Sequence, residues 1–297
     1  MGTVLKAVGG VAAVGATCFA WGLAEAHMYT VREAFAPLLA PGSRDIRILH
    51  ISDLHLMPRQ SRKVRFIADL AALRPDLVGN TGDNISNAAS LGPLMEAFGA
   101  LRSIPGVFVF GSNDYHAPTF KNPLRYLSRR KREPRVKDLL PTSELRKRLQ
   151  GLGWEDLTHR RVTMDVAGRR IAFRGTDDAH IDQDDYSTVA GPPDAADLNI
   201  AVTHAPYLRL LDAMAADRMD LILAGHTHGG QVCVPGYGAL VTNCDLDARR
   251  VKGLSSHTSG AHTSALHVSA GLGTSPHAPY RFACRPEVTL LTLTART

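Results

Sequence analysis

The chain has 297 residues, of which 44% are hydrophobic and 21% are charged. This length allows one large domain or two average ones, and the balance is ordinary for a globular protein, which excludes an intrinsically disordered chain. The net charge is +6 at pH 7. The segment Lys121–Arg148 contains eleven Lys and Arg and three acidic residues, so its net charge is +8 and that of the remaining chain is −2. The basic character therefore belongs to one segment, and a nucleic-acid-binding protein is not indicated by the whole chain.

The N-terminal segment from Ala7 to Ala24 contains 18 uncharged residues, and Lys6 precedes it. At about 1.5 Å per helical residue, this stretch approaches the minimum for crossing a hydrocarbon core of about 30 Å. We expect residues 1–26 to be a single membrane anchor, which would place the protein at the cell membrane. The alternatives are a signal segment cleaved near Ala26, which would give a secreted protein, and a buried or peripheral helix. Basic residues flank the segment on both sides, so its orientation is not predicted.

From Asp45 onward, short apolar runs rich in β-branched residues alternate with helical patterns. The apolar runs are bounded by turn-forming residues, which is typical of buried strands. In chain order, the predicted strands are 46–51, 76–79, 106–110, 171–174, 198–202, 221–224, 266–269 and 288–293. Helical patterns cover Val64–Leu73, which ends before Pro75, and Leu91–Ile104. This alternation predicts an α/β fold.

Four cysteines, at positions 18, 233, 244 and 284, show no CxxC spacing. Cys18 lies in the apolar N-terminal run, which leaves an odd number elsewhere. A zinc ribbon or a disulfide framework is therefore not indicated. We expect reduced, partly buried thiols, with one disulfide, for instance between Cys233 and Cys244, as the alternative.

Five of the predicted strands are followed at once by Asp, Asn or His residues. The five segments are Ser52-Asp53-Leu54-His55, Asn80-Thr81-Gly82-Asp83-Asn84, Gly111-Ser112-Asn113-Asp114, Thr203-His204 and Gly225-His226-Thr227-His228-Gly229-Gly230. A single Asp-x-His or Gly-Asp-Asn is common in ordinary surface turns. Five such segments in succession are not explained by independent turns, and ligands of α/β folds bind at the carboxyl ends of strands. We therefore predict that these side chains form one site.

The residues of this predicted site offer carboxylate, imidazole and amide ligands. This set suits Mn, Fe, Zn or Ni rather than the oxygen cages of Ca²⁺ and Mg²⁺. No cysteine lies in the five segments, so a thiolate ligand is not expected. A carboxylate that bridges two ions about 3.5–4 Å apart supports in-line displacement at phosphorus. The sequence thus predicts two divalent or trivalent metal ions as cofactors.

The succession D-x-H, G-D-N, G-S-N-D, T-H, G-H-T-H resembles the calcineurin-like metallophosphoesterase family. The S-D-L-H-L start and the G-H-T-H-G-G-Q end look like the bacterial membrane-associated phosphodiesterase branch of this family. The resemblance covers residues 46–293. It implies an α/β fold in which residues 45–297 form a four-layer αββα sandwich of two mixed β-sheets, preceded here by one apolar helix.

The resemblance also implies a role for each position. It assigns three ligands to the first ion: Asp53, His55 and His228. Asp83 would bridge both ions. Three further ligands would complete the second ion: Asn113, His204 and His226. Water between the ions would lose a proton near neutral pH and attack phosphorus in line, while the ions neutralise the phosphoryl oxygens. The implied reaction is hydrolysis of a phosphodiester or a phosphomonoester.

The third segment departs from the usual family form, Gly-Asn-His-Asp. Aligned without a gap, Ser112 takes the ligand position and Asn113 replaces the His. With a shift of one residue, Asn113 keeps ligation and the His is lost; we prefer this alternative because an amide oxygen is a better ligand than a neutral hydroxyl. Since general acid catalysis contributes about 10²–10⁴-fold, we expect Asp114 or His116 to replace the missing His. We expect Asn84 and Ser112 to contact the substrate.

The basic segment Lys121–Arg148 follows this third block. One interpretation is a binding patch for anionic lipid headgroups, which a lipid-linked substrate or a membrane surface would present. The alternative is an ordinary solvated helix face. Nucleic acid is a less favoured partner because only Phe120 and Tyr126 offer aromatic rings there. The alternative functions are a nuclease of the same fold and a non-catalytic scaffold with a residual metal site.

Three further histidines lie near the predicted strands and loops of the site. His50, inside the first strand, is expected to be a core residue or to support the site from behind. His267 is expected to be structural, and His180 could approach the substrate.

Overall fold

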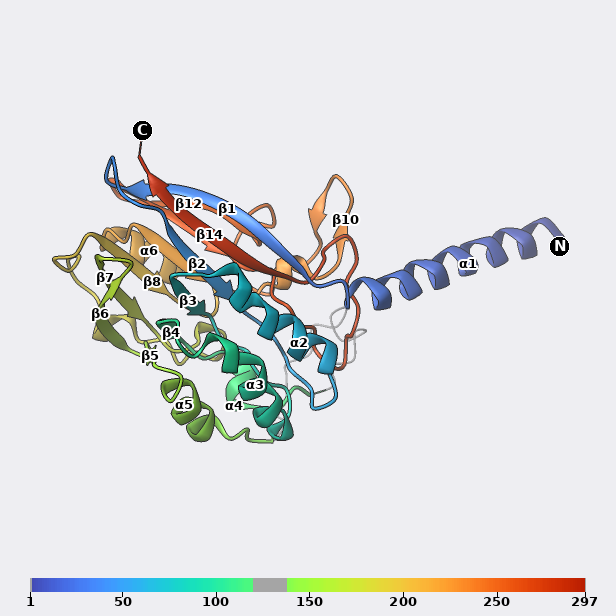
Figure 1. Cartoon of the computed structure of the whole chain (residues 1–297). Helices are drawn as coiled ribbons and strands as arrows, with labels where there is room; N and C mark the ends of the chain where they lie inside the picture. Colours follow the sequence, from blue (N-terminus) through green and yellow to red (C-terminus); the bar gives the residue numbers. More distant parts are fainter. Residues whose placement is uncertain (1, 120–137, 297) are drawn as a thin grey trace.

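The computed structural model describes residues 2–119 and 138–296, and two large mixed β-sheets form its centre (Figure 1). The strands of the first sheet are β1 (Thr30–Leu39), β2 (Ile46–Ile51), β3 (Leu77–Asn80), β4 (Gly106–Phe108), β5 (Trp154–Asp156) and β14 (Glu287–Ala295). They lie in the order β1-β14-β2-β3-β4-β5. Strands β2 to β5 run parallel, and β14 runs antiparallel to β2.

The second sheet is also mixed and has six strands. Its strands are β6 (Arg160–Val166), β7 (Arg169–Gly175), β8 (Leu198–Val202), β9 (Leu221–Ala224), β12 (Gly253–Ser259) and β13 (His262–Val268). They lie in the order β12-β13-β9-β8-β7-β6, with four parallel strands between two antiparallel edges. A small hairpin of β10 (Cys233–Val234) and β11 (Gly238–Ala239) stands apart from both sheets.

Helices cover the outer faces of the two sheets. The longer ones are α2 (Ser61–Asp69), α3 (Leu91–Phe98) and α5 (Thr142–Gln150) on the first sheet, and α6 (Leu208–Ala216) on the second. Short helical turns complete the described part: α4 (Ser112–Tyr115), η1 (Leu70–Leu73), η2 (Ala88–Ser90), η3 (Gly99–Leu101), η5 (Ala179–Ile181), η6 (Tyr186–Thr188) and η7 (His228–Gly230). An apolar core that includes Ile48 and Leu77 from one sheet and Ile200 and Leu223 from the other lies between the sheets. The predicted α/β sandwich is therefore confirmed.

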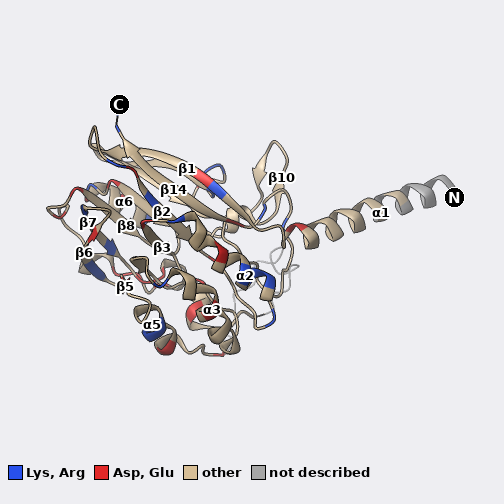
Figure 2. Ribbon diagram, in the orientation of Figure 1, with Lys and Arg blue, Asp and Glu red and all other residues tan. Residues whose placement is uncertain are grey.

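The chain begins with helix α1 (Gly2–Glu25), which projects away from the sheets (Figure 1). Its sequence carries two charged residues, Lys6 near its start and Glu25 at its end, and Figure 2 draws the length between the grey N-terminal part and the red end in tan. Within residues 2–119 and 138–296, no helix is both long and apolar enough to cross a membrane. The predicted helix is present, but the predicted membrane span is not found there.

All eight predicted strands are present, and they are the eight interior strands of the two sheets. The prediction missed the four edge strands, β1, β5, β6 and β12. Strand β1 pairs in parallel with β14 from Thr30 onward, so the first sheet includes residues that precede Asp45. Residues 121–137 of the predicted basic insertion lie outside the described residues, and its remainder leads into α5.

Candidate metal centre

The predicted ligands gather where the carboxyl ends of parallel strands from both sheets meet. Asp53 and His55 follow β2, and Asp83 follows β3. His204 follows β8, and the loop after β9 carries His226 and His228. Because both sheets turn the carboxyl ends of these strands to the same edge, residues far apart in sequence form one cluster.

Two groups of side chains in this cluster are arranged to hold a cation. Asp53, His55 and His228 form one group, and Asp53, Asp83 and His204 form the other, with the ligand atoms of each group within 4.8 Å of one another. The two groups share Asp53, and Asp83 Oδ2 of the second group lies 3.3 Å from His55 Nε2 of the first and 3.6 Å from His204 Nε2 of its own. Five of the seven predicted ligands are thus brought together.

The other two predicted ligands lie against this cluster but in neither group. Asn113 donates its backbone N–H to Asp83 Oδ1 and its side-chain Nδ2 to Asp83 Oδ2, both at 2.7 Å. The His226 ring packs against His204 at a centroid distance of 5.2 Å, and its Nε2 lies 3.3 Å from the carbonyl of Asn243.

Backbone strain is concentrated in the candidate ligands. Asp53, His55, Asp83, His226 and His228 all have positive φ, between 41° and 69°. A left-handed backbone costs about 1–3 kcal/mol in a residue other than glycine, and such strain clusters at functional sites. Five strained residues in one cluster indicate that the fold holds these side chains for a purpose other than stability.

Two glycines allow this close packing. A Cβ on Gly225 would collide with Ser52 Oγ and Asp53 Oδ2, and a Cβ on Gly111 would collide with Asp83 Oδ1 and the His204 ring. The glycines of the sequence motifs are therefore required by space inside the cluster.

Backbone carbonyls are hydrogen-bond partners of three histidines. His204 Nδ1 lies 2.7 Å from Thr81 O, and because a carbonyl can only accept, this Nδ1 carries the proton and Nε2 faces the cluster. His228 Nδ1 lies 3.2 Å from Gly273 O and 3.3 Å from Arg281 Nη2, an acceptor and a donor, and its Nε2 faces the cluster. His226 has the opposite arrangement, because its Nε2 faces Asn243 O, which leaves Nδ1 as the nitrogen able to bind a metal. Such carbonyl partners are typical of metal-binding histidines.

The cluster fits a cation because several of its buried polar atoms have no hydrogen-bond donor to satisfy them. Among the described residues, Asp53 Oδ1 and His204 Nε2 are buried without a hydrogen-bond partner. His55 Nε2 and His228 Nε2 approach to 3.1 Å. Buried polar atoms without partners are costly, and a metal ion between these atoms would satisfy them.

The electrostatics of the cluster agree with this fit. Burial opposes charge on His204, but the carboxylates of Asp83, Asp178 and Asp53 outweigh it and raise the pKa of His204 to about 10. Burial likewise opposes charge on Asp83, yet His204, His55 and the Asn113 hydrogen bonds hold the pKa of Asp83 below its ordinary value. Burial, together with the negative charge of Asp83, raises the pKa of Asp53 to about 6. The carboxylates therefore attract positive charge to the cluster.

The predicted catalytic residue Asp114 holds the loops of the cluster. Its side chain is fully buried, and its carboxylate accepts the backbone N–H groups of Asp83 and Asn84 at 2.8 Å and of Gly111 at 3.1 Å. Burial and nearby Asp83 raise the pKa of Asp114 to about 7, while these N–H donors favour its charged form. With its oxygens bonded to the backbone, Asp114 is placed to position the loops, and its role as a catalytic acid stays a prediction.

The predicted substrate-binding residues differ in their surroundings. Asn84 is fully buried, donates Nδ2 to Asp114 and accepts Asn80 Nδ2 at 2.7 Å, so its contacts are structural and the expected substrate contact is not supported. Ser112, at the start of α4, is half-buried and lies 3.4 Å from Asn113 Nδ2. His116 ends α4, is half-buried, and pairs across an isolated bridge with Leu139.

A chain of hydrogen bonds enters the cluster from between the sheets. His267 Nδ1 and His50 Nδ1 are 2.8 Å apart, and His50 Nε2 lies 3.1 Å from Thr81 Oγ1. The Thr81 hydroxyl donates to Ser52 Oγ at 2.7 Å, and Ser52 donates to Asp53 Oδ2 at 2.5 Å. All five residues are fully buried. We call these residues the Asp53 relay: every proton points toward Asp53, so His50 donates to Thr81 and accepts from His267.

Three more residues near the cluster were missed or only suspected from the sequence. Arg281 is fully buried and donates to the carbonyls of Gly273 and His228 at 2.7 and 3.2 Å. His180 packs against His226 with ring centroids 4.4 Å apart. Burial raises the pKa of Asp178 to about 6. Arg281 stands in no recognisable motif, whereas His180 and Asp178 could have been found from their clustering in Asp177-Asp178-Ala179-His180.

Comparisons with known proteins agree with this geometry. The sequence model of the calcineurin-like phosphoesterase family matches residues 46–230. The chain is 28% identical to phosphodiesterase YaeI of Escherichia coli, over 83% of this chain and 82% of that protein. It is 28% identical to the uncharacterised metallophosphoesterase YkoQ of Bacillus subtilis, over 84% of each.

Two further similarities are more partial. The uncharacterised protein YpbG of Bacillus subtilis is 27% identical over 64% of this chain, and the match spans only 59% of YpbG. Among solved structures, TT1561 of Thermus thermophilus is similar with a TM-score of 0.41 and 13% identity, covering 77% of this chain and 91% of that one.

Proposed function

Since the chain belongs to the calcineurin-like phosphoesterase family, a family of metal-dependent phosphoester hydrolases, we propose that it hydrolyses phosphodiesters or phosphomonoesters with two metal ions. The observation that carries this proposal is the place of Asp83. One carboxylate oxygen, Asp83 Oδ2, lies within 3.6 Å of imidazole nitrogens from both ligand groups. A carboxylate between two nitrogen ligands is suited to bridge two ions.

The residues divide between the two ions as the sequence suggested. Asp53, His55 and His228 would hold the first ion, with Asp83 as the bridge. His204 through Nε2 and His226 through Nδ1 would hold the second, together with Asn113. When bound, the ions would activate water and neutralise charge on the phosphoryl oxygens. The donor set favours Mn, Fe, Zn or Ni.

The chain's own residues keep this arrangement in place before any substrate arrives. Asp114 fixes the backbone on either side of Asp83, and the Asp53 relay holds one oxygen of Asp53 through the Ser52 hydroxyl. The second oxygen, Asp53 Oδ1, is left for the cluster. Prior orientation of this kind removes the cost of reorganising the groups during the reaction.

Two half-buried imidazoles are our candidates for the proton donor to the leaving group. His116 follows the third motif, where the family His is missing, and His180 packs against the candidate ligand His226. We propose His116 or His180, rather than Asp114, as the proton donor. A lipid-linked substrate and a position at the cell membrane, or secretion after cleavage near Ala26, stay predictions.

The test is hydrolysis by the full chain, stripped with a chelator and reloaded separately with Mn, Zn, Fe or Ni. We expect metal-dependent release of nitrophenol from p-nitrophenyl phosphate or bis-p-nitrophenyl phosphate, and the ratio of the two rates gives the ester preference. His116→Ala and His180→Ala, each measured on nitrophenyl and alkyl esters, separate the proton donor, because a donor matters only for the alkyl group. Absence of metal-stimulated hydrolysis of either ester overturns the proposal.

A further inference from the structure

Two cysteines outside the candidate metal centre form a buried pair. Cys233 in β10 and Cys284 before β14 are 5% and 1% exposed. Both sulfurs lie within hydrogen-bond distance of the same oxygen, Gly229 O, at 3.3 and 3.4 Å, and the two thiols are close enough to interact with each other. A backbone bond of 2.8 Å from Cys233 N to Phe282 O ties the two segments together. The four cysteines are free, and the thiol beside Cys233 is Cys284 rather than Cys244, which was the alternative from the sequence.

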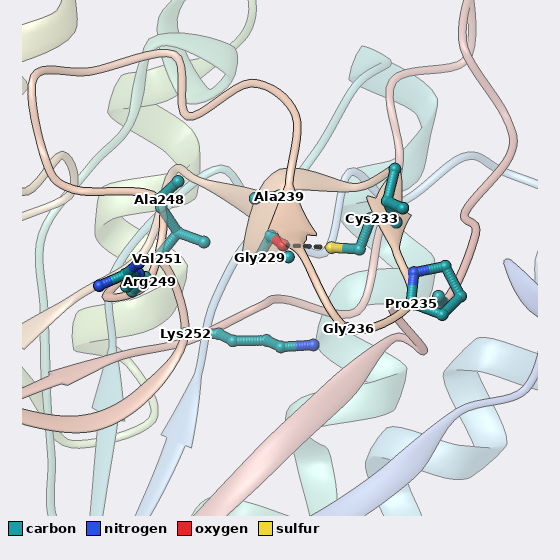
Figure 3. Close-up of a pocket in the computed structure, with 12 residues that line it drawn as sticks. Gly229, Cys233, Pro235, Gly236, Ala239, Ala248, Arg249, Val251 and Lys252 are labelled. Carbon is teal, nitrogen blue, oxygen red and sulfur yellow. Dashed lines mark hydrogen bonds between the residues drawn. The ribbon is translucent and has the colours of Figure 1, made fainter.

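A pocket borders one member of this pair, Cys233. The pocket has a volume of about 250 Å³, and Cys233, Arg249 and Lys252 are among its lining residues. Figure 3 shows Cys233 in the pocket wall with its sulfur directed at Gly229, and the Lys252 side chain extended into the same space. Cys284 lies behind, with its sulfur 3.8 Å from Lys252 Nζ. The pocket therefore gives a small thiol reagent access to Cys233 first and to Cys284 second.

The pair is joined to the candidate metal centre by the residues that hold His228. Cys284 Sγ also lies 3.4 Å from His228 O, and Arg281 Nη1 donates to that oxygen at 3.2 Å. Gly229, whose carbonyl lies near both sulfurs, directly follows His228. A covalent bond between the sulfurs would remove both S–H donors from the carbonyls of Gly229 and His228.

We propose that Cys233 and Cys284 are an oxidisable dithiol, a modification site that controls the His228 loop through a reversible disulfide. The oxidant is a small disulfide, RSSR. The Cys233 sulfur attacks one sulfur of RSSR, forms a mixed disulfide and releases one RSH. The Cys284 sulfur then attacks Cys233, forms the protein disulfide and releases the second RSH. Two thiols are oxidised, one disulfide reagent is reduced, and both thiol protons leave with the two RSH molecules.

The experiment uses the full chain with Cys18→Ser and Cys244→Ser, so that only the proposed pair remains. Oxidised glutathione is added in stages, thiols are counted after denaturation, and non-reduced peptides are identified by mass spectrometry. We expect both thiols to disappear together, a peptide that joins Cys233 to Cys284, and an affinity for Zn²⁺ about tenfold lower, as for other losses of support to a metal-binding His. Dithiothreitol should restore both properties.

The same background carrying Cys233→Ser is the matched control, because it keeps Cys284 and cannot form the bond. Its Zn²⁺ affinity should not respond to oxidised glutathione. The proposal is overturned if the two thiols stay free at oxidant levels that oxidise free dithiothreitol, or if the disulfide forms with unchanged Zn²⁺ affinity. Thiol counts and Zn²⁺ binding do not require turnover, so failure of the proposed hydrolase activity would be recognised separately.

Discussion

The two sides of the candidate metal centre are held in different ways. On the Asp53 side, which comprises Asp53, His55 and His228, supporting partners are buried and include the Asp53 relay and a backbone carbonyl. On the side of the second proposed ion, which we call the Asn113 side, Asn113 is half-buried and contacts Asp83 from the short helix α4. The Asp53 side keeps the family motifs, whereas Asn113 stands in the one motif that departs from them. Asn113 is held by a helix of four residues, whereas a replacement of Asp53 would also break the buried relay.

Replacing the residue that both sides share should have the largest effect. Asp83→Asn keeps the shape of the side chain but removes the charge that lies between His55 and His204. We expect kcat/KM for the nitrophenyl esters to fall by at least about 10²–10³-fold, the scale of losing one preorganised electrostatic group. Asp212→Asn, at an exposed carboxylate paired with His257, is the matched control and should change kcat/KM little. Activity of Asp83→Asn near the wild-type value would contradict the bridging role.

Asp114→Asn tests the support behind Asp83. An amide cannot accept all three backbone N–H groups that now bind the Asp114 carboxylate. We expect metal affinity to fall about 10–100-fold and the free energy of unfolding to fall by about 1–3 kcal/mol, measured by chelator competition and by denaturant unfolding. Equal activity at saturating metal would confirm positioning. A loss confined to alkyl esters at full metal occupancy would instead restore the proton-donor role.

The pH dependence of metal binding probes His204. In the metal-free protein the pKa of His204 is raised to about 10, so the ring is protonated at neutral pH and must lose that proton to bind a metal. Affinity should therefore increase with pH, by about tenfold per unit between pH 7 and 9, and level off above about 10. Chelator competition at constant ionic strength measures the slope. A slope near zero would show that His204 is already neutral or does not bind the ion.

Interrupting the Asp53 relay tests the buried side. Thr81→Val removes the hydroxyl that joins His50 to Ser52, and Thr81→Ser keeps it. We expect about tenfold weaker metal binding for Thr81→Val and near-normal binding for Thr81→Ser. Thr289→Val is the control, since Thr289 is buried on β14 opposite His50 and its hydroxyl has no hydrogen-bond partner among the described residues. Equal losses of metal affinity in Thr81→Val and Thr289→Val would show that the effect comes from general packing and not from the relay.

The smallest effect is expected at Ser112. The two alignments of the third motif give the ligand role either to Ser112 or to Asn113, and Asn113 is the one in contact with Asp83. Ser112→Ala should change metal affinity less than about threefold, while Asn113→Ala should lower it about tenfold. The reverse ranking would favour the alignment without a gap.

The sheets show which parts of the fold could be predicted from sequence. Interior strands such as β8 and β9 are buried at every position, so their residues are apolar except for Asn199 in β8. The edge strand β1 is partly exposed, carries Arg32 and Glu33, and pairs only with β14. Its sequence lacks the continuous apolar run of a buried strand, and only the long-range pairing with β14 defines it.

The same contrast applies to the site. The ligands could be predicted because each follows a strand in a motif with glycines. Thr81 and Ser52 stand beside ligands, but their hydroxyls could have faced any direction, and His267 reaches the site only through the packing of one sheet on the other. The motif position of Asp114 likewise does not reveal that backbone N–H groups bind its carboxylate.

The most direct test of the dinuclear site is the number of metal ions bound per chain, counted by native mass spectrometry while Mn²⁺ or Zn²⁺ is titrated into the metal-free full chain. Two ions per chain are predicted for the wild type, with hydrolysis of bis-p-nitrophenyl phosphate or p-nitrophenyl phosphate rising as the second ion binds. Asp83→Asn should lose the second ion first. A wild-type chain that reaches full activity with one ion, or binds none, would contradict the assignment of Asp83 as a bridge between two metals.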